Sequence, residues 1–513
     1  MDIKPYGVLT AVGIGIGAMI GSGWLFSAYY AARFIGPASI ISWAIGAGIA
    51  LVLALLLAEI AGLFSADALF IRLLTISHDN ADLGFIIGIS GWLGLCLVIP
   101  TEASATIQYL SSITPALGDM LLLDGKHTPF GSICVASLVI AYTLINFWGM
   151  RTFASVSNAI AVFKIVVPVL TALILIATSF HLSNFTVLKF APYGYEPIFS
   201  GIVVCGIFYA FYGFSLVAMY GQSLKNPKKN IPRALVFSVF IVFLIYALLQ
   251  LAFVGSLPQS LVQQGWSNLN FTSPFAQLLI LLSMPILSMW AMVLYVDAAV
   301  SPSGTAVICL SSATRSMTGM ADDSQMPAYF KKLHPKYLIS RRSLLATTLL
   351  SCLVLIFFKN WQELMILVSI FQLLSCIAIP VAFTKLRSSK PHIERVYRLK
   401  GGNIWSYLAF MLLSYFLIKT DWYSLFVASA ILVALFVIYV LNYYKNQWHE
   451  IFRAFYAAWS LFLYLFLVCL FAVSNHFKLL GNYDGLIAYL IVLSFNFRLL
   501  INQKYSRAGY FEK

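Results

Sequence analysis

Near the start of the chain the sequence reads Gly13-Ile14-Gly15-Ile16-Gly17-Ala18-Met19-Ile20-Gly21-Ser22-Gly23. This stretch lies within an apolar run near residues 8–33, long enough to cross a bilayer as a helix of roughly 20 residues. Five of these eleven residues are glycine, and each glycine weakens a helix by about 1 kcal/mol relative to alanine. We therefore expect the first span to be interrupted here. A membrane tolerates such a break only where the freed backbone groups line a cavity or bind a ligand.

A second stretch predicts a matching interruption in the sixth apolar run. It reads Gly206-Ile207-Phe208-Tyr209-Ala210-Phe211-Tyr212-Gly213-Phe214-Ser215, with aromatic residues crowded around Gly213. Paired interruptions at corresponding positions of two halves are typical of transporters built from inverted repeats. The glycines of the first stretch have another interpretation, in which they only permit close packing between helices.

The composition places most of the chain in a membrane. Of 513 residues, 61% are hydrophobic and 10% are charged, whereas roughly one-quarter of the residues of a soluble domain are charged. Fourteen apolar runs are candidate spans and predict an all-α membrane protein, because barrel strands are short and alternate in polarity. The ninth, eleventh and fourteenth runs are the shortest, so twelve or thirteen spans is an open alternative. The runs lie near residues 8–33, 38–63, 84–112, 131–149, 156–179, 198–220, 234–255, 286–314, 343–358, 362–384, 404–418, 422–442, 454–473 and 486–501.

The basic residues predict which loops face the cytoplasm. Fourteen spans with cytoplasmic N- and C-termini place the dense basic loops inside, at residues 225–233, 331–342 and 385–400. Cytoplasmic loops of membrane proteins carry such an excess of Lys and Arg. Few basic residues fall outside: Arg33, Lys126, Lys189, Lys359, Lys419 and Lys478. The expected surroundings are therefore a lipid bilayer, and no nucleic-acid partner is needed to explain the net charge of +14.

Four ionisable side chains are predicted to lie within spans, where charges are rare and mark functional candidates. They are Glu59, Glu102, Lys164 and Asp297. A buried lysine can release its proton near neutral pH, as a proton-coupled cycle requires. The alternative for Lys164 is a permanently charged strut bonded to carbonyls of the first break. Glu102 and Asp297 could each accept a proton or balance a substrate charge, whereas Glu59 is expected to pack helices or form a gate.

The two expected breaks predict where a substrate binds. A new half-helix starts at residues 21–23, and its positive N-terminal end suits a carboxylate. The freed N–H groups there belong to Gly21, Ser22 and Gly23. Carbonyl groups that could face an ammonium are those near Met19, Tyr209 and Tyr212. Walls or gates of the pocket could be formed by Phe208, Phe211 and Phe214, although each of these aromatic residues could instead belong to the core.

Three motifs together resemble the amino acid, polyamine and organocation (APC) transporter superfamily. They are Gly17-Ala18-Met19-Ile20-Gly21-Ser22-Gly23, Phe211-Tyr212-Gly213-Phe214, and Lys225-Asn226-Pro227 followed by Ile231-Pro232-Arg233. The resemblance implies a leucine-transporter-like inverted-repeat fold of five plus five helices, with helices 1 and 6 broken. It places the first repeat at residues 1–180, the second at 197–386 and additional C-terminal membrane helices at 403–503.

The same resemblance implies roles for single residues. It assigns the substrate carboxylate to the amides of residues 21–23 and the α-amino group to the carbonyls of Met19, Tyr209 and Tyr212. Lys164 is similar to the lysine that takes the place of a sodium ion in proton-coupled members. The family would place this lysine near the first break and near one of three residues of the eighth span, namely Ser301, Ser303 or Thr305.

Two further comparisons with the superfamily bear on the substrate. The stretches 98–106 and 297–305, which contain Glu102 and Asp297, most resemble the bacterial aspartate:proton symporter branch. Many members carry an acid where this chain has Ser215 in the pocket. A pocket without that acid is less suited to a cationic side chain, so acidic or small neutral amino acids are the expected substrates.

The expected function is proton-coupled symport of such an amino acid by alternating access, in the inner (plasma) membrane of a bacterium. Exchange of amino acids or amines without proton coupling is the alternative within transport, and a membrane amino acid sensor is the alternative of another class. The sequence shows no nucleophile and base pair, metal cluster or phosphate loop, and therefore predicts neither an enzyme nor a metal or cofactor. It leaves the oligomeric state open.

Overall fold

The computed structural model describes residues 7–64, 68–148, 150–445, 447–479 and 481–503, and most of these residues are helical. The first helices are α1 (Val8–Met19), α2 (Ser22–Ile35), α3 (Ser39–Leu63), η1 (Leu69–Arg72), α4 (Leu73–His78), α5 (Ala81–Leu110), α6 (Pro115–Leu121), α7 (Pro129–Phe147) and α8 (Met150–Ser179). A short antiparallel ribbon, β1 (Leu122–Leu123) with β2 (Lys126–His127), pairs Leu122 with His127 between α6 and α7.

The middle of the chain continues in the same way. Its helices are η2 (Leu182–Phe185), α9 (Glu196–Val204), α10 (Ile207–Tyr212), η3 (Gly213–Ser223), α11 (Pro227–Ser256), α12 (Gln259–Gln263), η4 (Trp266–Asn268), α13 (Pro274–Leu281) and α14 (Pro285–Asp322). The last helices are η5 (Ala328–Lys331), α15 (Arg341–Val354), α16 (Trp361–Cys376), α17 (Ala378–Ser389), α18 (Gly402–Ile418), α19 (Trp422–Tyr444), α20 (Trp448–His476) and α21 (Asn482–Asn502).

Several helices begin where the sequence carries a capping side chain. The side chains of Asn80, Thr128, Ser340, Asn360 and Asp421 each accept a hydrogen bond from the backbone N–H three residues later. Such caps satisfy backbone donors that a helix leaves without partners in its first turn. The starts of α5, α7, α15, α16 and α19 are thus fixed by local chemistry.

The helices confirm the predicted all-α membrane architecture. Within the described residues, ten helices are long and apolar enough to cross a membrane, and up to twelve are if each bent pair forms one span. The bent pairs are α1 with α2 and α9 with α10, so the first and sixth spans are the interrupted ones. Two of the three shortest predicted runs form the short helices α15 and α18. The 14 residues of α15 would extend only about 21 Å, less than the roughly 30 Å of a hydrocarbon core.

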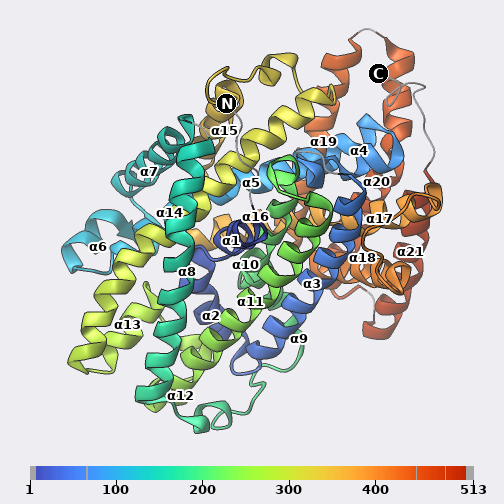
Figure 1. Ribbon diagram of the computed structural model, residues 1–513. Coiled ribbons are helices and arrows are strands. Elements are labelled where there is room, and N and C mark those ends of the chain that lie inside the picture. The colour runs from blue at the N-terminus through green and yellow to red at the C-terminus, as the bar shows by residue number, and fades with distance from the viewer. Residues whose placement is uncertain (1–6, 65–67, 149, 446, 480, 504–513) are drawn as a thin grey trace.

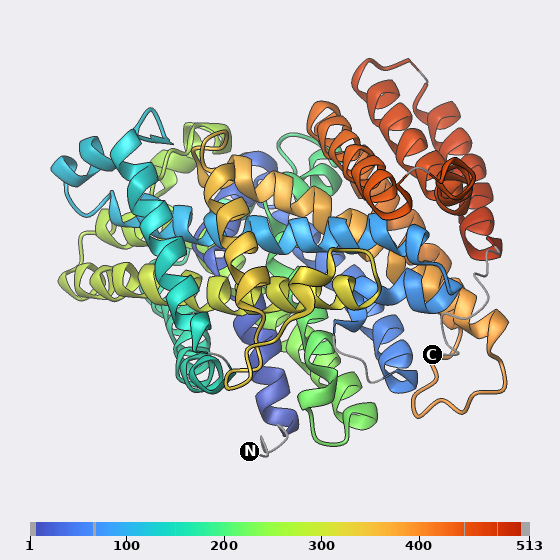
Figure 2. The ribbon, with the colours of Figure 1, turned by 90° about the horizontal axis from the view of Figure 1, so that it is seen from above.

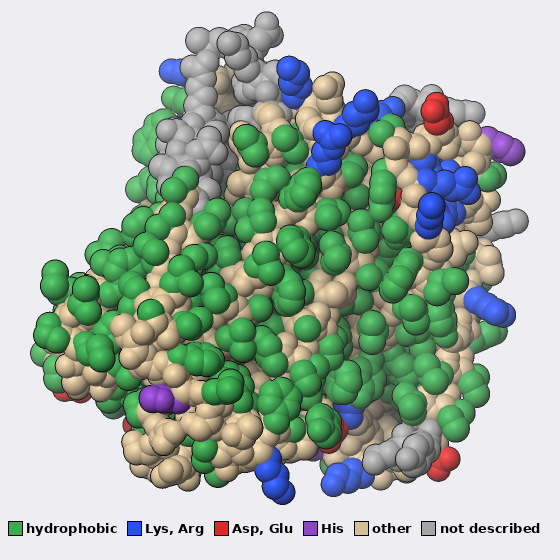
Figure 3. Space-filling model, turned by 60° about the horizontal axis from the view of Figure 1, so that its bottom comes forward, with side chains coloured by type: hydrophobic (Ala, Val, Ile, Leu, Met, Phe, Trp, Pro, Cys, Tyr) green, Lys and Arg blue, Asp and Glu red, His purple; other side chains and the backbone are tan. Residues whose placement is uncertain are grey.

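The helices differ in how far the protein itself buries them. The most apolar stretch of α5 is entirely buried, because α5 packs against α14 and α16. The late helices α18 to α21 gather on one side of the molecule, as Figures 1 and 2 show from two directions. Figure 3 shows a broad face of hydrophobic side chains, with Lys and Arg collected along its margins. A lipid-facing surface accounts for this distribution.

A buried carboxylate at the start of α5 joins the late helices to the centre. Asp82 lies in the first turn of α5 and accepts hydrogen bonds from the hydroxyl groups of Tyr439 and Tyr444, at 2.9 Å each. Next to it, the side-chain amide of Asn80 donates to the carbonyl of Ala457 at 3.1 Å. These contacts tie α5 to α19 and α20.

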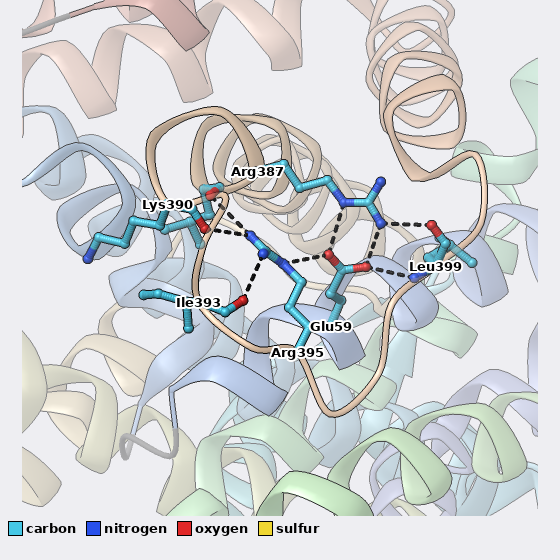
Figure 4. A network of polar contacts seen from close by, with 7 residues as sticks. Glu59, Arg387, Lys390, Ile393, Arg395 and Leu399 are labelled. Atoms are coloured by element: carbon cyan, nitrogen blue, oxygen red, sulfur yellow. Dashed lines mark hydrogen bonds and ion pairs between the residues drawn. The ribbon is translucent and has the colours of Figure 1, made fainter.

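An ion-pair network ties the end of α3 to the end of α17. Glu59 of α3 accepts two hydrogen bonds from Arg387 of α17, at 2.9 and 2.7 Å, and a third from the backbone N–H of Leu399 at 2.7 Å. Figure 4 shows the carboxylate between Arg387 and Arg395, whose Nε lies 3.1 Å from Glu59. The side chain of Glu59 is 2% exposed, so one carboxylate balances two guanidinium groups away from solvent. The network thereby holds the loop between α17 and α18 against α3.

A second ion pair closes the same end of the bundle. Arg72 of η1 binds both carboxylate oxygens of Asp323 after α14, at 2.6 and 2.5 Å. Nearby, the side-chain amide of Gln325 donates to Thr75 at 3.0 Å and to the carbonyl of Ala81 at 2.7 Å. The segment that follows α3 is thus fastened to the end of α14.

We expect Glu59→Gln to lower the thermal unfolding midpoint of the detergent-solubilised protein, because the neutral amide leaves two arginines without a counter-charge. Removing one partner of a buried ion pair costs roughly 3–5 kcal/mol, and the partial exposure of Arg387 places the expected loss toward the lower end of that range. Glu394→Gln, the same change at an exposed position of the adjoining loop, is the control. Equal midpoints for the two variants would contradict a stabilising role for the network.

Candidate functional site

The first interruption lies at Ile20 and Gly21, inside the predicted glycine-rich stretch. The axes of α1 and α2 differ there by 49°. A side chain at Gly21 has no room, because an added Cβ would lie 2.5 Å from Oε1 of Glu102 and 2.7 Å from Oγ1 of Thr305. Glycine at this position therefore lets two polar side chains approach the exposed backbone.

The second interruption lies at Cys205 and Gly206, at the start of the predicted stretch 206–215 and not beside Gly213, around which the aromatic residues gather. The axes on either side of Gly206 differ by 58°, and Gly206 has φ of +76°, a left-handed conformation that glycine adopts readily. At Gly213 the chain instead passes from α10 into the 3-10 helix η3. An added Cβ at Gly213 would lie 2.5 Å from the carbonyl carbon of Ala18. Gly213 is thus the point where the sixth span crosses closely over the first.

A carboxylate of the protein binds at the start of α2. The backbone N–H of Ser22 donates to Oε2 of Glu102 at 2.7 Å, and the hydroxyl of Tyr209 donates to Oε1 of the same side chain. The hydroxyl of Ser22 lies 3.3 Å from that of Tyr209 and accepts a hydrogen bond from the indole N–H of Trp361 at 2.8 Å. Glu102 is 1% exposed. It therefore connects the two broken helices through one buried carboxylate.

A buried ammonium lies on the other side of the first break. Nζ of Lys164 donates to the carbonyl of Gly17 at 2.5 Å and to Oγ1 of Thr305 at 2.6 Å. Oγ1 of Thr305 also lies 3.0 Å from the Gly17 carbonyl oxygen and 3.2 Å from that of Ile20. Both groups that accept from Lys164 are uncharged oxygens. The lysine of α8 and the threonine of α14 thus donate hydrogen bonds to the carbonyls that have no helical partner at the end of α1.

The other polar residues predicted in the eighth span make their described hydrogen bonds with groups other than Lys164. Asp297 accepts hydrogen bonds from the indole N–H of Trp24 at 3.0 Å and from the hydroxyl of Ser301 at 2.7 Å. Ser303 lies 3.0 Å from the hydroxyl of Tyr142. Of the three candidates offered by the resemblance, Thr305 is the one that contacts Lys164, and Ser301 and Ser303 serve other partners.

Two of the three carbonyls predicted to bind an ammonium accept hydrogen bonds from side chains of the protein. The carbonyl of Met19 accepts from the hydroxyl of Tyr246 at 3.0 Å, and that of Tyr212 accepts from the hydroxyl of Ser215 at 3.1 Å. Tyr246 stacks on Trp43, with ring centroids 4.6 Å apart. Tyr209 takes part in the site through its phenol group, as described above.

Aromatic side chains surround these polar groups. Phe208, Phe211 and Phe214 are all buried, and Phe211 packs edge-on against Trp43 and Tyr246. Trp361, at the start of α16, stacks on Phe26 at 4.8 Å and on Tyr30 at 5.5 Å between ring centroids. A cavity of about 600 Å³, lined by Tyr30 and Asn360 among others, begins beside this stack. The stack therefore separates Ser22 and Glu102 from that cavity.

Sequence reasoning missed Trp361, Tyr246 and Trp24. Trp361 and Tyr246 reach the site from helices far along the chain, through an indole N–H and a hydroxyl group, and Trp24 reaches Asp297 from α2 itself. No spacing rule marks such a residue. The sequence does carry a local signal at Asn360, which caps the start of α16 and so makes Trp361 the first residue of that helix.

Known proteins resemble this chain over most of its length. The family described as amino acid permease matches residues 6–447. The glutamate/serine transporter AimA of Bacillus subtilis (strain 168) is 36% identical over 472 residues, which cover 90% of this chain and 86% of that protein. The aspartate-proton symporter of the same organism is 27% identical over 480 residues, which cover 92% and 91% of the two chains. The branched-chain amino acid permease BcaP of the same organism is 24% identical over 450 residues, which cover 85% of this chain and 92% of that protein.

We expect Gly206→Ala to lower the thermal unfolding midpoint, because a non-glycine residue in the left-handed conformation costs about 1–2 kcal/mol. The new Cβ would also press on Sδ of Met365, at 3.0 Å. Gly48→Ala is the matched control, since Gly48 lies in α3 with open space around it. In a helix, alanine is favoured over glycine by roughly 0.5–1 kcal/mol. A midpoint for Gly206→Ala at or above that of Gly48→Ala would contradict a break fixed by the conformation of Gly206.

Proposed function

Since this chain belongs to the amino acid permease family, we propose that it is a proton-coupled symporter of an acidic or small neutral amino acid that works by alternating access. Membership of the family makes the chain an integral membrane amino acid transporter with several spans. The family's proteins are permeases, which move their substrates without converting them. The observation that carries the finer proposal is the pair of breaks with Glu102 and Lys164 on either side of Gly21.

The polar groups at the breaks support an amino acid as the substrate. Ser22 presents a backbone N–H at the positive end of α2, which favours a carboxylate. Met19 and Tyr212 present carbonyl groups that the hydroxyls of Tyr246 and Ser215 occupy, and an ammonium could bind such oxygens in their place. The printed names of two relatives, a glutamate/serine transporter and an aspartate-proton symporter, support an acidic or small neutral side chain.

In this proposal Lys164 carries the proton that is transported together with the amino acid. Its ammonium is buried and is bonded to the carbonyl of Gly17 and the hydroxyl of Thr305, so its protonation is coupled to the backbone of the first break. Loss of the proton would weaken the charge-assisted hydrogen bond to Gly17 and loosen the end of α1. The same contacts fit a permanently charged strut, and the experiment below separates the two.

We propose that two groups of contacts close the two entrances to the site. On one side stands the stack of Trp361, Phe26 and Tyr30. On the other side, the ends of α3 and α14 are held by the ion pairs of Glu59 and Asp323. In alternating access one closure opens while the other holds. With the basic loops at 225–233, 331–342 and 385–400 in the cytoplasm of a bacterium, the ion pairs form the inner closure and both termini lie inside.

Lys164→Ala is expected to abolish uptake that is driven by a pH gradient in proteoliposomes, while exchange of labelled for unlabelled substrate persists. Radiolabelled glutamate, aspartate and serine are the probes, and Lys359→Ala, at an exposed position, is the control. Undiminished gradient-driven uptake by Lys164→Ala would exclude the lysine as the proton carrier. If the wild type shows only exchange and no response to the gradient, the protein is an exchanger. If it binds the probes but moves none of them, it is a sensor.

Among the twenty amino acids, we expect glutamate, aspartate and serine to raise the thermal unfolding midpoint of the purified protein more than arginine or lysine does. Ser215 and the other polar side chains described near Tyr212 offer no carboxylate to a cationic side chain. A ligand at one hundred times its Kd stabilises by about 2.7 kcal/mol. A larger shift with arginine than with all three expected substrates would contradict the proposed specificity.

A further inference from the structure

The carboxylate of Glu102 lies where a substrate carboxylate would have to bind. Ser22 belongs to the first turn of α2, whose N–H groups have no helical partner. Its N–H is taken by Oε2 of Glu102, a side chain 80 positions away on α5. Oε1 of Glu102 also lies within 2.5 Å of the point where a Cβ of Gly21 would stand. The carboxylate is therefore in contact with the backbone of the break.

We propose that Glu102 is an internal ligand of the transport site, whose charged carboxylate and the carboxylate of a substrate exclude each other. This inference rests on the proposed function, because it concerns the same site. Two carboxylates cannot accept from one N–H at 2.7 Å, and two negative charges at such a distance repel strongly away from water. In the absence of substrate, Glu102 satisfies the backbone of the break. When a substrate binds, it takes over the N–H of Ser22.

The second contact of Glu102 shows how the exchange affects the rest of the site. The phenol of Tyr209 donates to Oε1 of Glu102 and lies 3.3 Å from the hydroxyl of Ser22. Glu102 thus bridges α2 and α10, the two half-helices that start after the breaks. Once Glu102 leaves, the N–H of Ser22 becomes free for the substrate carboxylate, and the bridge through Glu102 to Tyr209 is broken.

Protonation is the event that releases Glu102. A neutral carboxylic acid accepts a weaker hydrogen bond than a carboxylate does, and it no longer repels the substrate. The titratable groups that face Glu102 come from five helices: Tyr209 of α10, Lys164 of α8, Tyr142 of α7, Tyr246 of α11 and Cys309 of α14. Asp297 of α14 is held separately by Trp24 and Ser301. Of these side chains that face Glu102, Lys164 is the one that carries a positive charge when it is protonated.

The test compares serine with ethanolamine, which is serine without its carboxylate, by isothermal titration of the purified protein. Glu102→Gln removes the competing charge, so we expect serine to bind roughly tenfold more tightly than to the wild type. Ethanolamine does not need the N–H of Ser22 and should gain no affinity. The wild type should bind serine more tightly as the pH falls, and Glu102→Gln should show a weaker dependence, since only Lys164 of the two groups still titrates.

The opposite role for Glu102 gives the opposite result. If its carboxylate binds the substrate ammonium, Glu102→Gln weakens the binding of serine and ethanolamine alike, and the inference is wrong. It is also wrong if the pH dependence in Glu102→Gln is as steep as in the wild type, because Lys164 or another group then carries all of it. If neither the wild type nor the variant binds any amino acid, the proposed function fails instead.

Tyr209→Phe supplies a second variant in case Glu102→Gln does not fold. It removes the phenol that holds Oε1 of Glu102 and leaves the carboxylate in place. A loosened carboxylate competes less well, so serine should again bind more tightly, by a smaller factor than in Glu102→Gln. Weaker serine binding with unchanged ethanolamine binding would overturn the inference, since it would make the phenol a partner of the substrate only.

Discussion

The interruption at Ile20 and Gly21 leaves backbone groups without helical partners in the interior of a membrane protein, where an unsatisfied polar group is costly. Four different helices each send one side chain to these groups. Lys164 of α8 and Thr305 of α14 donate to the carbonyl of Gly17. Tyr246 of α11 donates to the carbonyl of Met19. Glu102 of α5 accepts from the N–H of Ser22. The packing of the central helices therefore converges on one broken turn.

The signs of the charges at this turn follow the helix dipoles. The C-terminal end of α1 carries partial negative charge and meets the ammonium of Lys164, whereas the N-terminal end of α2 carries partial positive charge and meets the carboxylate of Glu102. The two side chains are opposite in charge, and each is matched to its own helix end. An amino acid in its zwitterionic form carries the same two charges on one small molecule.

Much of this arrangement could be predicted from the sequence. The length of the apolar runs indicates the spans, and five glycines in eleven residues indicate the first break. The second break could not be located, because a glycine that adopts positive φ, such as Gly206, looks in a sequence like a glycine that allows close packing, such as Gly213. Spacing also says nothing about which of several serines and threonines on one helix faces Lys164. Likewise, the contact between Glu102 and Ser22 joins residues 80 positions apart and depends on how the helices are packed.

The attachment of α5 at its other end has a consequence for motion. Asp82 and Asn80 fasten the start of α5 to α19 and α20, and the rest of the helix is enclosed by α14 and α16. A helix that is anchored at one end and buried along its length is held firmly, whereas α1 and α2 beside it are separated by a break. Glu102 belongs to the anchored helix α5, and Ser22 belongs to α2, which begins at the break. Under the proposed mechanism, a tilt of α2 moves Ser22 relative to the carboxylate of Glu102, so the hydrogen bond between them has to break and re-form in each transport cycle.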